Sequence, residues 1–238
     1  MTTEITRLEN PIDVMYLIHK ALRAEAAKVE ELVRQFEIGN SLQTFRCAFN
    51  FWASALGFHA QQEDKFMTAP LTNSQPARDN EAEHVALGGM LGNLAECLDK
   101  DQTSSLAERV SEAMVALNKQ QHTELVEKLE DVMAGLNDEI GTTKVIARTQ
   151  RHLYQRVLAL RVAQDDHLEN EEAFVLPEIW LRISEADQLK MAQRLLIDED
   201  ADNQRWVVDW VTEALSPGEL ELLENLVRRF ESVAARVG

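Results

Sequence analysis

Two short segments, far apart in the chain, share the pattern H-x-x-x-E-[DE]-x-F, and each is followed closely by a proline. They are His59-Ala-Gln-Gln-Glu63-Asp64-Lys-Phe66 before Pro70 and His167-Leu-Glu-Asn-Glu171-Glu172-Ala-Phe174 before Pro177. A histidine and a glutamate four residues apart lie on the same face of an α-helix. Both pairs interrupt apolar helical stripes, which normally face a protein interior. The sequence therefore predicts two helices that each direct a His–Glu pair inward.

Two further histidines, His19 and His84, also occupy positions where a leucine or phenylalanine is expected on an apolar stripe. An ionised carboxylate is too costly to bury in an apolar interior unless it is paired or binds a metal. Four imidazoles and two carboxylates from four helices can satisfy one another by binding two divalent cations. Imidazole together with carboxylate suits iron above all, with manganese or zinc as possible alternatives.

The rest of the chain favours helix almost throughout. Gly and Pro together supply only 14 of the 238 residues, about half of the usual share of ~12%, and no strand pattern is visible. Apolar periodicity and capping signals predict a polar loop at 72–80 and helices at 10–38, 41–69, 79–99, 102–140 (one helix or a hairpin), 143–176, 185–197, 203–214 and 217–235. The last of these follows a capping box formed by Ser216 and Glu219.

These helices indicate an all-α fold. We expect an antiparallel four-helix bundle over residues 10–180, with a helical insertion at 101–141. Residues 181–238 are expected to form a helical C-terminal extension packed on the bundle.

The order H…HxxxE…H…HxxxE resembles the hemerythrin-like family, also called the HHE cation-binding domain. The resemblance implies a four-helix bundle that holds two iron ions in a non-haem di-iron centre with an oxo or hydroxo bridge. Carried over residue by residue, it implies that the four histidines are terminal ligands and that the two glutamates bridge the irons. The implied metal ligands are His19, His59, Glu63, His84, His167 and Glu171.

One departure from the oxygen-carrying hemerythrins concerns the third helix. Those proteins have an additional histidine one turn from the third-helix ligand, whereas Asn80 and Gly88 stand four residues either side of His84 here. In this chain the place of the additional histidine can be taken by water or by one of four side chains: Glu81, Gln62, His122 or His152. The smaller set of histidines argues against simple reversible oxygen carriage. In this respect the chain resembles the iron-sensing and stress-related members of the family.

Several polar residues flank the expected ligands. Tyr16, one turn before His19, can hydrogen-bond a metal-bound ligand or lie at a helix interface. The acidic residues Asp64, Glu172 and Asp166 can accept hydrogen bonds from ligand imidazoles or can simply be solvated. The residues predicted to surround the ligands are Tyr16, Gln62, Glu81 and Asp166.

The charge balance excludes several classes of protein. Lys and Arg total 24 against 41 Asp and Glu, which gives a net charge of −17 and argues against binding to nucleic acid or to anionic membrane surfaces. Cys47 and Cys97 form neither a CxxC pair nor a disulfide framework, so we expect a reducing, cytoplasmic location. No apolar run approaches the ~20 residues of a membrane span, and the first residues have no signal-peptide core.

Three functions remain open. The first is a di-iron protein that binds O2, NO or peroxide, in sensing or in stress and iron homeostasis. The second is a di-iron enzyme that activates O2 or breaks down peroxide, and the third is a metal-free, acidic helical interaction module. The sequence identifies no catalytic residue, organic substrate or protein partner.

Overall fold

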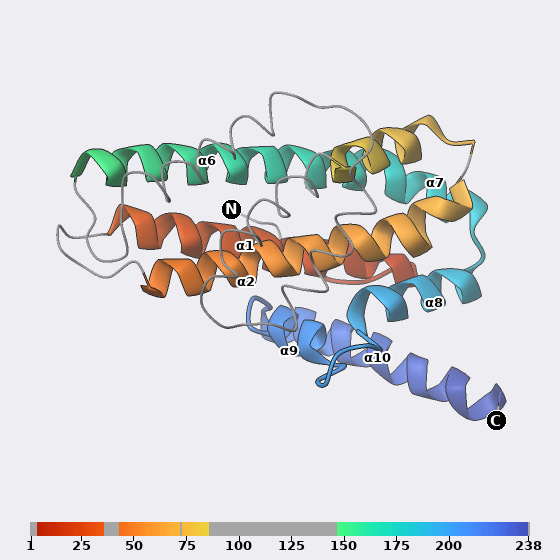
Figure 1. Cartoon of the computed structure of the whole chain (residues 1–238). Coiled ribbons are helices and arrows are strands. Elements are labelled where there is room, and N and C mark those ends of the chain that lie inside the picture. Colours follow the sequence, from red (N-terminus) through yellow and green to blue (C-terminus); the bar gives the residue numbers. More distant parts are fainter. Residues whose placement is uncertain (1–3, 36–42, 72, 86–146, 238) are drawn as a thin grey trace. The chain divides into compact units, whose positions relative to one another are not determined.

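The computed structural model describes residues 4–35, 43–71, 73–85 and 147–237 (Figure 1). All regular elements among them are helices, without a strand. The predicted all-α fold, a helical bundle, is thereby confirmed. The expected insertion at 101–141, with His122, lies outside the described residues.

The first two long helices begin close to where the sequence pattern places them. A 3-10 turn, η1 (Pro11–Val14), leads into α1 (Met15–Arg34), and the carboxylate of Asp13 accepts hydrogen bonds of 2.8 Å from two backbone N–H groups before the turn. The second helix is α2 (Gln43–Gln62). Its buried face carries Phe45 stacked on Phe49, which in turn meets Trp52 edge to face. Aromatic packing of this kind holds the apolar stripe of α2 in the interior.

The segment 72–80, predicted as a loop, is partly helical. Residues 75–85 form a helix, and the hydroxyl of Ser74 accepts a hydrogen bond from the backbone N–H of Ala77 at 3.5 Å. Pro76 stands in the first turn, where its missing N–H costs nothing. The loop prediction was therefore wrong for residues 75–80, and the helix predicted from 79 already starts at 75. A polar, proline-containing stretch is also a suitable helix start.

Both copies of the repeated motif end their α-helix in a π-helical segment. The first runs from α2 into η2 (Glu63–Thr68) and then into a 3-10 turn, η3 (Ala69–Leu71). The second runs from α6 (Ala147–Asn170) into η4 (Glu171–Val175). Each π segment begins at the glutamate of the motif, a placement that is frequent at functional sites.

The predicted helix end before Pro177 is wrong. The chain continues from η4 directly into α7 (Leu176–Arg182), and Pro177 lies at the second residue of this helix. In the first turn a proline breaks no hydrogen bond. The π segment starts a new set of hydrogen bonds, so the proline does not terminate the helical path.

The C-terminal helices agree with the sequence prediction. They are α8 (Glu185–Leu196), α9 (Trp206–Thr212) and α10 (Pro217–Val237), shown in blue in Figure 1. The expected capping box is present, because the backbone N–H of Ser216 donates to Glu219 at 2.9 Å and the N–H of Glu219 donates to the hydroxyl of Ser216 at 3.3 Å. It fixes the start of α10.

The chain divides into two compact units, which we describe separately. Unit 1 comprises residues 1–24, 62–78 and 168–238, and unit 2 comprises residues 25–61 and 79–167. The boundaries between them fall within α1, at the end of α2, within the helix 75–85 and near the end of α6. The predicted division into a bundle at 10–180 and an extension at 181–238 stays a prediction.

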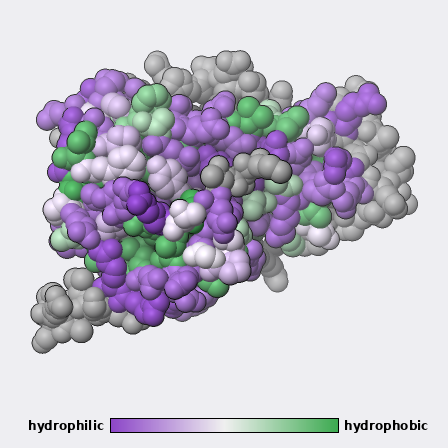
Figure 2. Space-filling model, turned by 180° about the vertical axis from the view of Figure 1, so that it is seen from behind, coloured by the Kyte–Doolittle hydropathy of each residue, from purple (hydrophilic) through white to green (hydrophobic). Residues whose placement is uncertain are grey.

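Each unit has its own apolar core. The core of unit 1 is formed by η1, the first half of α1, α7, α8 and the C-terminal helices. The core of unit 2 is formed by α2, α6 and the second half of α1. The face drawn in Figure 2 is largely hydrophilic, as the net charge of −17 leads one to expect. Among the described residues, no helix combines the length and the apolar character needed to cross a membrane.

Candidate metal centre

The six residues implied as ligands are all buried, each with at most 5% of its surface exposed. His19 lies on α1, His59 at the end of α2, and His84 on the helix 75–85. His167 lies near the end of α6, and the two glutamates begin the π segments η2 and η4. Ionisable groups buried to this degree need partners that compensate their charge.

In unit 1, His19 lies between two glutamates. Its Nδ1 is 2.8 Å from the carboxylate of Glu172, and its Nε2 is 3.3 Å from the carboxylate of Glu171. The same oxygen of Glu172 accepts a hydrogen bond from Arg23 at 2.8 Å. Of the two alternatives open for Glu172, the structure thus favours the one in which it contacts a ligand imidazole. This contact leaves Nε2 of His19 directed at Glu171.

The two glutamates also change the pKa of His19. Burial lowers it, but hydrogen bonds and charge interactions with Glu171 and Glu172 outweigh burial and raise the pKa of His19 to about 9. For Glu172, burial raises the pKa, yet His19 and Arg23 lower it below its ordinary value. In the metal-free protein, His19 therefore carries a proton at neutral pH, and a metal ion must displace it.

In unit 2, two histidines face each other. Nε2 of His84 lies 3.1 Å from Nε2 of His167, and Nδ1 of His167 lies 2.6 Å from the carboxylate of Glu83. Zinc–imidazole bonds are about 2.0–2.1 Å long, so two nitrogens bound to one ion at right angles are about 3 Å apart. The separation of the two Nε2 atoms therefore fits a shared metal ion.

The sequence did not single out Glu83 or Arg23. Arg23 stands four residues after His19 and so on the same face of α1, a spacing that could have identified it. Glu83 directly precedes His84 and therefore lies on a different side of that helix from the histidine, so no periodic signal marks it. Only the structure shows that it contacts His167.

The residues predicted to surround the ligands are less buried. Asp166 is exposed, and Tyr16, Gln62 and Glu81 are half-buried. Burial, followed by the charges of Asp13 and Glu172, raises the pKa of Tyr16. Neither of the two acidic residues, Glu81 and Asp166, belongs to a candidate ligand group among the residues that the structure describes. Their role around the metal stays a prediction.

Asn80 occupies one of the two positions where an additional histidine would stand. It is 3% exposed, and its Nδ2 has no hydrogen-bond partner within the described part of the chain. The side chain of His152, one of the alternatives for this ligand, is outside the described set, as is His122. The alternatives given by the sequence for the ligand that replaces the additional histidine therefore stay predictions.

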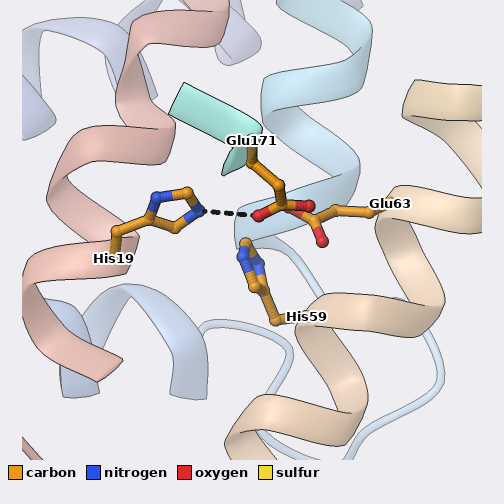
Figure 3. Close-up of side chains that lie close together, drawn as sticks. All are labelled: His19, His59, Glu63 and Glu171. Atoms are coloured by element: carbon orange, nitrogen blue, oxygen red, sulfur yellow. Dashed lines mark ion pairs between the residues drawn. The ribbon is translucent and has the colours of Figure 1, made fainter. Parts of the chain in front are cut away.

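The six buried residues form two groups of four that could each hold a metal ion. One consists of His19, His59, Glu63 and Glu171, and the other of Glu63, His84, His167 and Glu171. Within each group the ligand atoms lie within 4.8 Å of one another. In Figure 3 the four side chains of the first group point toward one another. Both groups contain the same two carboxylates, a donor set suited to a pair of cations with imidazole and carboxylate ligands.

Comparison with known proteins agrees with this geometry. The family model described as "Hemerythrin HHE cation binding domain" matches residues 10–119. This range includes His19, His59, Glu63 and His84, whereas the second HxxxE pair lies beyond it. Curated proteins and solved structures give no significant match. The family match over residues 10–119 confirms the resemblance to hemerythrin HHE cation-binding domains that the motifs carry.

Proposed function

We propose that the six buried residues hold two iron ions. His19 and His59 bind one ion, His84 and His167 bind the other, and Glu63 and Glu171 bridge the two together with an oxo or hydroxo group. The observation that carries this proposal is that two four-residue ligand groups share both glutamates. Imidazole–carboxylate ligation favours iron, and manganese or zinc would use the same residues.

Two of the imidazoles, those of His19 and His167, have carboxylate partners that orient them for metal binding. Glu172 and Glu83 each lie within hydrogen-bonding distance of an Nδ1 atom, of His19 and His167 respectively. Such a carboxylate sets the ring orientation and raises the basicity of the other nitrogen. Nε2 is then the ligand atom in both residues. When bound, the iron pair supplies a redox-active centre for small oxygen- or nitrogen-containing ligands.

We further propose that the ligand of this centre is O2, NO or peroxide, and that the protein acts in the cytoplasm in sensing or in stress and iron homeostasis. The presence of Asn80 and Gly88 in place of a further histidine favours this role over oxygen carriage. An enzyme that activates O2 or breaks down peroxide is the second candidate. Without the further histidine, one position on a metal ion can stay open to a substrate.

The decisive experiment is elemental analysis of protein expressed with ample iron and purified without chelators. We expect about two irons per chain, from two ligand groups that share bridging carboxylates. Failure to bind metal even after anaerobic reconstitution would refute the proposal. With iron bound, a persistent and reversible NO or O2 adduct supports a sensor, whereas turnover of peroxide in large excess over protein supports an enzyme.

A further inference from the structure

One residue on the inner face of α6 is an amide where the apolar stripe predicts a leucine. Gln164 has none of its surface exposed, and its Oε1 accepts a hydrogen bond of 2.6 Å from the indole Nε1 of Trp52, which is itself 1% exposed. Both residues belong to unit 2. A buried polar pair of this kind is costly unless each of its groups is satisfied.

The partner of Gln164 fixes which way its amide points. An indole N–H can only donate, so the oxygen of the amide must face Trp52 and the NH2 group must face away. Nε2 of Gln164 has no hydrogen-bond partner among the residues that the structure describes. A buried donor without an acceptor costs roughly 1–3 kcal/mol. The arrangement thus holds a strong donor in place and leaves it without an acceptor from the described chain.

The position of this donor relates it to the metal centre. Gln164 stands three residues before His167, so the two lie one turn apart on the same face of α6. Trp52 stands seven residues before His59, two turns away on the same face of α2. Trp52 on α2 therefore holds the amide of Gln164 within one helical turn of the candidate ligand His167 on α6.

We propose that Nε2 of Gln164 donates a hydrogen bond to the small molecule bound at the metal centre, and that Trp52 is the positioning residue that aims it. This inference rests on the proposed function. The ligand it favours is a two- or three-atom molecule whose end atom carries negative charge when bound. Azide is a stable probe of this class, whereas carbon monoxide accepts a hydrogen bond poorly. Gln164 thus makes the centre selective for ligands that accept a hydrogen bond.

The test compares azide titrations of iron-loaded protein, followed by absorbance, for the wild type and Gln164→Met. This substitution keeps nearly the same shape but removes both N–H donors. Iron content should not change, and azide should bind about five- to tenfold more weakly, which is the loss of one hydrogen bond of about 1 kcal/mol. Carbon monoxide binding, where it occurs, should not weaken.

Two controls separate donation from packing. Val157→Ala removes a fully buried side chain seven residues earlier on the same stripe of α6; it should lower the melting temperature and leave azide affinity within about twofold, because it removes no donor. The double variant Trp52→Phe with Gln164→Met removes both partners of the hydrogen bond. Because no buried group is then left without its partner, its metal-free form should melt within a few degrees of the wild type, while its azide affinity stays low.

The outcomes are distinct. Equal azide affinity in wild type and Gln164→Met, at equal iron content, would overturn the role of Gln164 and leave the di-iron proposal intact. An equal loss of affinity in Val157→Ala would also overturn it, because the effect would then come from packing. A wild type that holds two irons but shows no response to azide would refute small-ligand binding, and the role of Gln164 with it.

Discussion

Carboxylates are completely buried in two regions of this molecule, and the two regions compensate them differently. Near the C-terminal helices, Glu219 accepts hydrogen bonds from the backbone N–H groups of Ile5 and Ser216, at 3.1 and 2.9 Å, and from the ammonium group of Lys20. In the candidate metal centre, Glu63 and Glu171 are equally buried. Their near neighbours there are imidazoles and each other.

The difference lies in the source of positive charge. Lys20 is a cationic side chain that the chain itself provides, so Glu219 has its partner as soon as the protein folds. An imidazole is positive only when protonated, and of the histidines in the centre His19 has a pKa of about 9. The imidazoles and the two carboxylates together form donor groups that could hold cations from outside the chain. The first arrangement is therefore complete within the chain, whereas the second is suited to a metal ion.

The comparison is tested most severely by removing a carboxylate of the metal centre. Glu63→Ala or Glu171→Ala should abolish two-metal occupancy, because each glutamate belongs to both ligand groups. Iron per chain, measured by elemental analysis, reports the result. Glu169→Ala, at an exposed position of α6, is the matched control and should keep the wild-type content. Full metal retention in the Glu63 and Glu171 variants would overturn the ligand assignment.

Removing the carboxylate of the C-terminal region should affect stability and not metal content. Burial raises the pKa of Glu219, but Lys20 and the backbone N–H groups of Ser216 and Ile5 together lower it to about 2. The ionised form is therefore favoured in the folded state, and its contribution is present above the unfolded pKa of about 4.3 and lost as the pH falls toward 2. At pH 7, Glu219→Gln should destabilise the protein by about 2–3 kcal/mol.

The pH dependence distinguishes this effect from a packing defect. Denaturant unfolding of wild type and Glu219→Gln should show a gap in the free energy of unfolding at pH 7 that narrows progressively below about pH 4.5. Glu221→Gln, exposed on the same helix, should behave as the wild type. A gap that stays constant down to pH 2.5 would contradict the assigned role of the charge.

The two regions also differ in how far the sequence predicted them. The capping box of Ser216 and Glu219 and the inward-facing positions of His19 and His84 follow from local rules of helix capping and periodicity, and the structure agrees. The contacts of Glu219 with Ile5 and Lys20 join residues about 200 positions apart. No local pattern encodes such a contact, because it depends on how the helices pack.

The same limit applies to the metal centre. The sequence identified six residues that the structure brings into two groups, but it left open whether Glu172 contacts a ligand or water, and it did not identify Glu83. It also predicted that the helix ends before Pro177, because it could not anticipate the π segments that begin at Glu63 and Glu171. Whether an acidic side chain on a helix is solvated or paired is decided by the neighbouring helix.

The carboxylates behind the histidines provide a finer test of the metal centre. Substituting a partner of a ligand imidazole typically costs 10–100-fold in metal affinity, and we expect such losses for Glu172→Gln and Glu83→Gln. The loss should be greater at Glu172, whose side chain is 23% exposed and also bonded to Arg23, than at Glu83, which is 39% exposed. Competition with a metal-binding dye measures both affinities.

Glu169→Gln is the control for these two variants, because Glu169 is acidic and close in sequence to His167 but exposed. Its metal affinity should match that of the wild type. If it lost affinity as much as Glu83→Gln, the effect would reflect overall charge, and the assignment of Glu83 as the specific partner of His167 would be wrong.

The smallest expected effect concerns a histidine that the motif does not include. His122 lies in the charged stretch Asn-Lys-Gln-Gln-His-Thr-Glu, outside the described residues, and the sequence favours a surface position for it over the role of a further ligand. His122→Ala should therefore keep the wild-type iron content and azide affinity, whereas His84→Ala should lose metal from the group that contains it. Loss of iron in both variants would identify His122 as the ligand that replaces the additional histidine, and the centre would then have five histidines after all.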